Sequence, residues 1–417
     1  MRRELKFFDI FCLGLNSIIG SGIFLFPGLL AGHLGPASIL VFPLTGLCLA
    51  PVAWCFSVLA SRYDSTGGPY LYARDAFGPW AGFGIGWMCW LSNVLSYAAV
   101  ANAVSSYLGH FWEPMAAVVA VKISACLVIA GLGLLNYVGV KPAVRTADAF
   151  TVAKVIPLFL FVLAGLFFIK AGRFVPFAPE GFGGLGSAVF MAFFALQGFE
   201  NVPVPSGEAN QARRNAPLAV ILSLLSATVI YALIQFVAVG TYPGLAGSTK
   251  PLAQAAQVFL GPLAGIVAIG AAISTIGFST GAAFGGPRYL LALGTSFFPA
   301  KLTKFHPRFG TPYIAVSLHA ATTLVLALVL DFKKLVDLSN VTVALQYIVT
   351  CAAAWKLSRA GSPGDSWRLP LGPTLPLLGI AATLYLSSHA SFKEILFSAA
   401  ILAVGYLAAL ATRRATR

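Results

Sequence analysis

Glycine and serine interrupt a long apolar stretch near the N-terminus, in the run Gly20-Ser21-Gly22-Ile23-Phe24. Glycine gives the backbone freedom to unwind here. A helix that restarts after the break presents the N–H groups of Ser21, Gly22 and Ile23, together with the positive end of its dipole. Such a terminus suits a carboxylate. Small residues also form close-packing faces between membrane helices, so this motif by itself leaves binding and packing open.

A second interruption lies in the run Phe194-Ala195-Leu196-Gln197-Gly198-Phe199-Glu200, where a polar Gln-Gly pair and an acid break an apolar stretch, and we expect Gln197 to bind substrate. Carbonyl groups freed at the end of the preceding half-helix can accept hydrogen bonds from an ammonium. One break offers donors and the other offers acceptors, which together fit a zwitterion. Glu200 is the acid that we place deep inside an apolar stretch. At that depth an ionisable residue predicts proton binding or gate coupling, unless it lies near enough to the membrane surface to be solvated.

A serine hydrolase is a remote alternative. The run Gly277-Phe278-Ser279-Thr280-Gly281 matches G-x-S-x-G, and His319 follows in the next apolar stretch. The soluble nucleophile elbow needs a strand-to-helix turn, whereas this segment is an apolar helix with no acid near His319. Helix packing is therefore the favoured interpretation. A channel is disfavoured as well, because the sequence contains no repeated loop that would form a filter.

The composition of the 417 residues excludes a soluble globular protein. Hydrophobic residues make up 58%, charged residues 10%, and the mean hydropathy is +0.86. Soluble domains carry about 25% charged residues. A membrane-spanning helix needs about 20 apolar residues, and we identify twelve such stretches. They are residues 7–30, 37–59, 80–108, 115–135, 147–169, 185–204, 217–239, 261–284, 312–330, 336–355, 369–388 and 395–411.

The net charge of +14 follows from 27 Lys and Arg against 13 Asp and Glu. When the N-terminus is placed in the cytoplasm, most of these basic residues fall in cytoplasmic loops, as the positive-inside rule requires. The prediction is a multi-pass protein of the inner (cytoplasmic) membrane with both termini cytoplasmic. No Arg and Lys run is interleaved with aromatic residues, so nucleic acid is not an expected partner. Lys122 lies near the end of its stretch, from which it can snorkel.

The six cysteines lie inside apolar stretches without Cys-x-x-Cys spacing, which favours structural thiols over a metal site, and we expect no cofactor. The breaks fall in the first and sixth stretches. Matching interruptions in two halves indicate a transporter built on inverted repeats. We expect one membrane domain over residues 1–417, with repeats at about 7–169 and 185–355 and two further helices at about 369–411.

Three motifs in order resemble the amino acid–polyamine–organocation (APC) transporter superfamily, in a bacterial member. The first-helix break is similar to that family's motif. The run Gly67-Gly68-Pro69-Tyr70-Leu71-Tyr72 resembles its signature loop between helices two and three, and the loop from Gly207 to Pro217 resembles its loop after helix six. Gln211 departs from the pattern, because the family commonly has proline there.

The resemblance implies an all-α protein with the APC fold, a five-plus-five inverted repeat with broken helices one and six. It also implies site residues. The substrate carboxylate would meet Ser21 and Gly22, its amine would meet carbonyls near Ile18 and Phe194, and Phe194 would act as an aromatic gate.

Three further residues follow from the resemblance. Trp90 and Asn93 are similar to a Trp-x-x-Asn that faces the site in arginine/agmatine exchangers, although Asn93 is as consistent with an ordinary interhelical hydrogen bond. Lys154 resembles the fifth-helix lysine of sodium-independent members, where its ammonium replaces a cation between helices one, five and eight, near the carbonyls of the first break. Lysine snorkelling is the alternative.

The expected function is sodium-independent transport of amino acids or related amines by alternating access, as an exchanger or proton-coupled symporter, in a monomer or homodimer. A sodium-coupled symporter is the alternative, because the hydroxyls of Ser274, Thr275, Ser279 and Thr280 suit a hard cation, although such groups more often bond back to their own helix.

Overall fold

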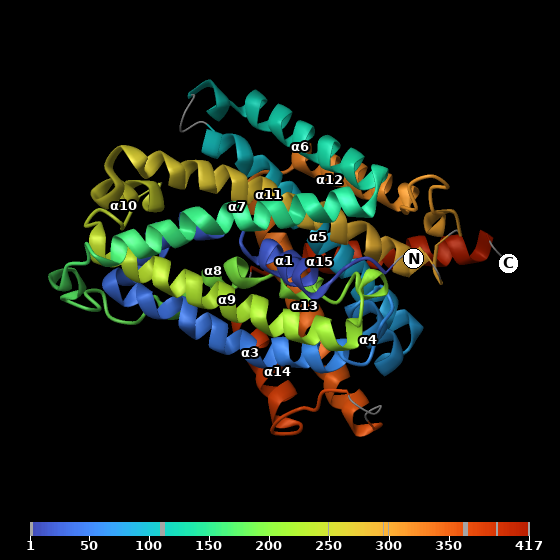
Figure 1. The fold of residues 1–417 in the computed structure, drawn as a ribbon. Helices are drawn as coiled ribbons and strands as arrows, with labels where there is room; N and C mark the ends of the chain where they lie inside the picture. The colour runs from blue at the N-terminus through green and yellow to red at the C-terminus, as the bar shows by residue number, and fades with distance from the viewer. Residues whose placement is uncertain are drawn as a thin grey trace.

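The computed structural model describes residues 3–108, 113–248, 250–294, 296–298, 300–361, 366–388 and 391–415. Within these ranges the protein consists of helices and their connections (Figure 1), and strand-type pairing is limited to one parallel bridge between Leu5 and Ala209. The α-helices are α1 (Phe7–Ile18), α2 (Gly22–Leu34), α3 (Val41–Ala60), α4 (Pro69–Phe77), α5 (Pro79–Leu108), α6 (Val118–Val138), α7 (Val140–Leu166), α8 (Leu185–Leu196), α9 (Ala212–Thr241), α10 (Pro251–Leu260), α11 (Gly265–Gly294), α12 (Tyr313–Val329), α13 (Phe332–Arg359), α14 (Thr374–Ser387) and α15 (Phe392–Ala415).

Every predicted apolar stretch overlaps a helix, and the first stretch contains α1 and most of α2. Eight segments in the described part of the chain are long and apolar enough to cross a membrane, and α1, α12 and α14 are shorter apolar helices beside them. The all-helical membrane class is therefore confirmed. The count of twelve spans and the inverted repeat stay predictions.

Two helices, α4 and α10, lie in segments that the sequence analysis treated as connections. Each begins with proline at its first position, and each is followed by a glycine with positive φ, at Gly78 (+96°) and Gly261 (+53°). Proline is preorganised for the first turn and glycine can adopt the conformation that ends a helix. Both helices were therefore marked in the sequence, but they are too short to span a membrane.

The departure at Gln211 has a structural meaning. This residue precedes α9 with φ +48° and ψ +45°. A proline ring holds φ near about −65°, so proline cannot adopt this left-handed conformation. The turn after the sixth stretch therefore differs locally from one that proline would form.

Helix α1 lies inside the bundle, packed against α7, α9 and α11 (Figure 1). In contrast, large apolar side chains face outward on α6 and α15, including Val118, Leu127, Phe392 and Leu407, which are 66–77% exposed. Helix faces that expose many large apolar side chains are unfavourable in water. These faces suit contact with lipid.

Both chain ends lie at one end of the bundle, and α10 lies at the other (Figure 1). At the terminal end, the N–H groups of Glu4 and Leu5 donate to Glu208 O, at 2.9 and 3.0 Å. The Glu208 carboxylate forms a buried bidentate pair with Arg288 of α11, with both N–O distances 3.0 Å. The N-terminal segment, the loop before α9 and α11 are thus joined at this end.

Candidate functional site

The first break separates α1 from α2. Helix α1 ends at Ile18 and α2 begins at Gly22, so residues 19–21 are outside both helices. The N–H groups of Gly22 and Ile23 open the new helix and have no carbonyl one turn earlier within it. The N–H of Phe24 donates to Ser21 O at 3.2 Å, and Ser21 itself is buried. The break therefore places helix-terminal donors inside the protein, as predicted.

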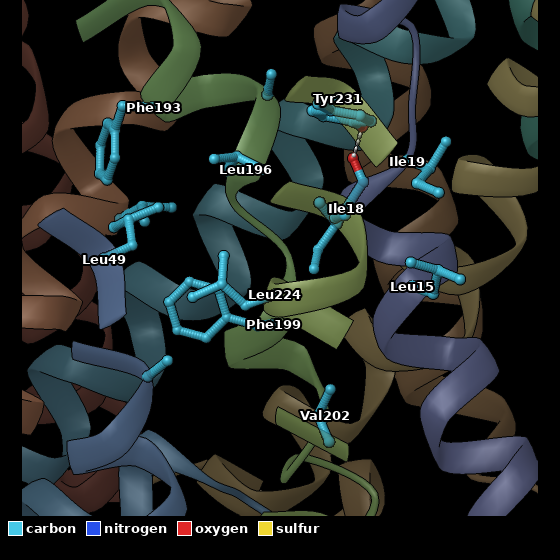
Figure 2. Packing of buried hydrophobic residues seen from close by; sticks show 14 of the residues in the cluster. Leu15, Ile18, Ile19, Leu49, Phe193, Leu196, Phe199, Val202, Leu224 and Tyr231 are labelled. Atoms are coloured by element: carbon cyan, nitrogen blue, oxygen red, sulfur yellow. Dashed lines mark hydrogen bonds between the residues drawn. The ribbon is translucent and has the colours of Figure 1, made fainter. Parts of the chain in front are cut away.

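The second break follows α8. Gln197 is extended and Gly198 has φ +128°, after which a short 3₁₀ turn, η4 (Phe199–Asn201), replaces a second long half-helix. A Cβ on Gly198 would lie 2.4 Å from the backbone carbon and oxygen of Ser17. Both the conformation and the close approach require glycine. The two breaks therefore pack backbone against backbone, and Figure 2 shows Phe199 and Ile18 close to this crossing.

A cavity lies at the crossing. It is lined by residues of both breaks, α5, α11 and α13. Seven predicted site residues are among them: Ile18, Ser21, Gly22, Asn93, Phe194, Gln197 and Glu200.

Three predicted residues do not line this cavity. Ile23 is fully buried. Trp90 packs on Trp87 with ring centroids 4.9 Å apart. Lys154 lies on the other side of the first break.

The predicted amine ligands are partly engaged already. Tyr231 donates its hydroxyl to Ile18 O at 3.2 Å, the bond drawn in Figure 2. Phe194 O accepts the N–H of Gln197 at 3.4 Å. Each carbonyl oxygen has a second lone pair, so both can still accept a hydrogen bond from an ammonium.

One face of α5, mostly polar, lines the cavity and was not predicted from the sequence. Cys89, Ser92, Ser96 and Val100 line the cavity with Asn93. Their spacing of three, four, seven and eleven residues from Cys89 follows one face of a helix, so the periodicity was a usable signal. Gln346 of α13 and Phe278 of α11 also line the cavity, and their spacing gave no comparable signal.

Glu200 is buried in the second break. Its Oε2 accepts the Gly198 N–H at 2.8 Å and the Tyr347 hydroxyl at 2.7 Å. One carboxylate oxygen thus joins the break to α13. Desolvation by the surrounding helices strengthens such bonds and makes their loss costly.

Lys154 of α7 is fully buried against the first break. Its ammonium donates to Asn16 O at 2.9 Å and to Ile19 O at 2.5 Å. Ser274 of α11 donates to Ile19 O and Gly20 O, at 3.2 and 3.0 Å. The carbonyl groups that α1 frees at its end are therefore held by a lysine and a serine from two other helices.

The remaining hydroxyls of α11 bond back to their own helix: Thr275 to Ala271, Ser279 to Thr275 and Thr280 to Gly277. In the described ranges, no hydrogen bond joins Ser279 to His319. Instead, His319 stacks on Tyr97. Nor do three or more His, Cys, Asp or Glu side chains gather there as a metal site would need.

Lys122, which was expected to snorkel towards the membrane surface, forms hydrogen bonds with a neighbouring helix. Its ammonium donates to Ala327 O and Leu330 O, at 2.5 and 3.1 Å. These carbonyls end α12, where a cation is favourable. The side chain therefore caps a neighbouring helix.

A second, larger cavity lies towards α10. Phe24, Ala103 and Ala271 line it, two, three and seven residues from Gly22, Val100 and Phe278, which line the first cavity on α2, α5 and α11. The Glu200–Tyr347 bond lies at the second break, which lines the first cavity, and the buried Glu208–Arg288 pair lies towards the chain ends. The second cavity thus lies at the end of the bundle opposite the chain ends.

A sequence profile of the amino acid permease family matches residues 5–406, which is nearly the whole chain. The chain belongs to this family. The resemblance to APC transporters is thereby confirmed, and the family and the relatives are transporters rather than enzymes.

The relatives include transporters whose names give different substrates. The branched-chain amino acid permease BcaP of Bacillus subtilis is 28% identical, over 93% of this chain and 88% of its own. The methylthioribose transporter of Bacillus subtilis is 27% identical, over 92% and 88%. The serine/threonine exchanger SteT of Bacillus subtilis is 25% identical, over 92% and 90%.

Proposed function

We propose that this permease carries an amino acid or related amine across the cytoplasmic membrane by alternating access. The carrying observation is the cavity between two packed helix breaks, one beginning a helix at Gly22 and one ending a helix at Leu196. Helix-terminal N–H groups favour the substrate carboxylate, and carbonyls of the opposite break favour its ammonium. Among the relatives, the branched-chain permease and the serine/threonine exchanger support an amino acid as substrate.

Transport is proposed to be sodium-independent, because Lys154 supplies a positive charge to the carbonyls of the first break. A bound Na⁺ would need those same oxygens. Exchange and proton-coupled symport both agree with this arrangement. The sodium-coupled alternative rests on Ser274, whose hydroxyl reaches the same carbonyls.

Gating is assigned to the two ends of the cavity. Phe194 lies on its wall and contacts Phe26 edge-on, with ring centroids 6.3 Å apart, so it can cover a bound substrate. Glu200 and Tyr347 connect the second break to α13. With the termini in the cytoplasm, the larger cavity faces outward, so this conformation awaits substrate from outside.

Uptake of a labelled amino acid panel into proteoliposomes tests the proposal. Uptake that rises when the vesicles contain unlabelled amino acid indicates exchange, and uptake driven by an inward proton gradient indicates symport. Replacing Na⁺ by K⁺ should leave the rate unchanged. A strict sodium requirement would favour the symporter alternative, and failure of the whole panel would contradict amino acid transport.

A matched pair of variants tests the carboxylate site. A Cβ at Gly22 would lie 3.2 Å from Ala195 and from Phe26, whereas one at Gly32, in the same helix, would meet nothing within 4 Å. Gly22→Leu should therefore abolish substrate binding in folded protein, and Gly32→Leu should not. Wild-type affinity in Gly22→Leu would remove the site from this break.

A further inference from the structure

Two buried amide side chains face the cavity without using all their hydrogen-bonding atoms. Asn93 of α5 is 7% exposed and Gln346 of α13 is 1% exposed. Within the described residues, Asn93 Oδ1 and Gln346 Nε2 have no hydrogen-bond partner. Buried polar atoms are nearly always paired in proteins, so unpaired ones at a binding cavity call for a partner from the ligand.

The surrounding polar groups are uncharged and largely satisfy one another. Ser339 of α13 contacts the hydroxyls of Ser96 and Ser92, at 2.6 and 3.3 Å. Gln197 donates to Asn340 Oδ1 at 2.9 Å. These pairs leave Asn93 Oδ1 and Gln346 Nε2 available for a hydrogen bond to a substrate in the cavity.

Charge is scarce at the cavity. Glu200 is the one Asp, Glu, Lys or Arg among its described lining residues, and its Oε2 is occupied by Gly198 and Tyr347. An acidic substrate side chain would therefore lose its hydration without gaining an opposite charge, which is costly. A cationic one would meet only Glu200, whose Oε2 already accepts two hydrogen bonds. The cavity favours a neutral side chain.

We propose that the substrate is an amino acid with a short, uncharged, hydrogen-bonding side chain, a hydroxyl or a carboxamide, and that Asn93 and Gln346 read it. This inference rests on the proposed function and narrows it. A hydroxyl both donates and accepts, so it can pair with the free oxygen of Asn93 and the free nitrogen of Gln346. Turning either amide by half a turn exchanges its donor and acceptor, and a hydroxyl or carboxamide still finds a partner.

An aliphatic side chain of the same size would fill the space and leave both amides unpaired. The penalty for an unpaired buried polar group exceeds the net gain from an ordinary neutral hydrogen bond. From these magnitudes we expect a hydroxyl to be preferred over an isosteric methyl by about 10-fold or more.

Isosteric competitors test this in the wild-type protein. Uptake of labelled substrate into proteoliposomes is measured against threonine and valine, and against asparagine and leucine. Threonine and asparagine should compete at concentrations about 10-fold or more below those of their apolar partners. If valine and leucine compete as well or better, the side-chain inference is wrong while amino acid transport stands. If no amino acid is carried, the proposed function is wrong, and so is this inference.

Variants test the two residues. Asn93→Leu and Gln346→Met should bring the threonine-to-valine ratio close to one, mainly by raising the KM for threonine. Asn136→Leu is the matched control, because Asn136 Oδ1 is also buried and unpaired but lies outside the cavity, on α6. Size-exclusion chromatography checks folding. A wild-type ratio in both folded cavity variants would overturn the assignment of Asn93 and Gln346, and a collapsed ratio in Asn136→Leu would show that the change is nonspecific and overturn it as well.

Discussion

Replacing Lys154 by methionine removes a charge and keeps the length of the side chain. In the native protein, the Lys154 ammonium donates two hydrogen bonds, to Asn16 O and Ile19 O. In the variant, Ile19 O would keep the Ser274 hydroxyl as a donor. Among the described residues, no side chain other than Lys154 donates a hydrogen bond to Asn16 O. The first break would lose the contact that joins it to α7.

The magnitude follows from those two bonds. A hydrogen bond with a charged partner contributes about 1.5–3 kcal/mol, so the pair contributes about 3–6 kcal/mol. The ammonium also bears a desolvation penalty, which the variant no longer bears. We therefore expect Lys154→Met to lower the free energy of unfolding by about 2–4 kcal/mol. Because the variant also loses the contact that holds the first break against α7, we expect transport by the folded protein to fall about 10-fold or more, which corresponds to about 1.4 kcal/mol.

Lys122→Met is the matched control. Its ammonium also donates to two carbonyls, Ala327 O and Leu330 O, but these end α12 rather than the break. It is half-buried, whereas Lys154 is fully buried. Both variants should lower the melting temperature in detergent, and only Lys154→Met should reduce uptake in proteoliposomes strongly. Wild-type uptake and melting temperature in Lys154→Met, or equal uptake in both variants, would refute the reasoning.

Three further predictions concern the two breaks and the Glu208–Arg288 pair. Gly198→Ala should abolish the thermal stabilisation of the protein by substrate, because its Cβ would clash with backbone at 2.4 Å, whereas Gly181→Ala, strained at φ +70° but with open space, should retain it. Phe194→Ala should weaken substrate affinity about 10-fold by uncovering the cavity, with Phe194→Trp milder; equal affinities would make it a packing residue. Glu208→Gln leaves Arg288 buried without its charge partner, so the free energy of unfolding should fall by about 3–5 kcal/mol, and an unchanged melting temperature would contradict this.

Local sequence determined the helices and the places where they stop. Apolar runs of sufficient length can satisfy their backbone groups in lipid only as helices, so composition and periodicity indicated the membrane class. Gly20, Gly22 and Gly198 marked the breaks because glycine tolerates conformations that other residues avoid. The role of Lys154 at the first break was expected from its resemblance to the fifth-helix lysine of sodium-independent APC members, with snorkelling as the alternative.

Only the tertiary structure decided which of these features meet. Lys154 and Asn16 are 138 residues apart, and Glu200 and Tyr347 are 147 residues apart. The packing of α5 against α13 and α11 also directs Asn93 and Gln346 to one cavity. A side chain's place on its own helix follows from local periodicity, but the neighbour it faces depends on how distant helices pack, and a single sequence carries no local signal for that.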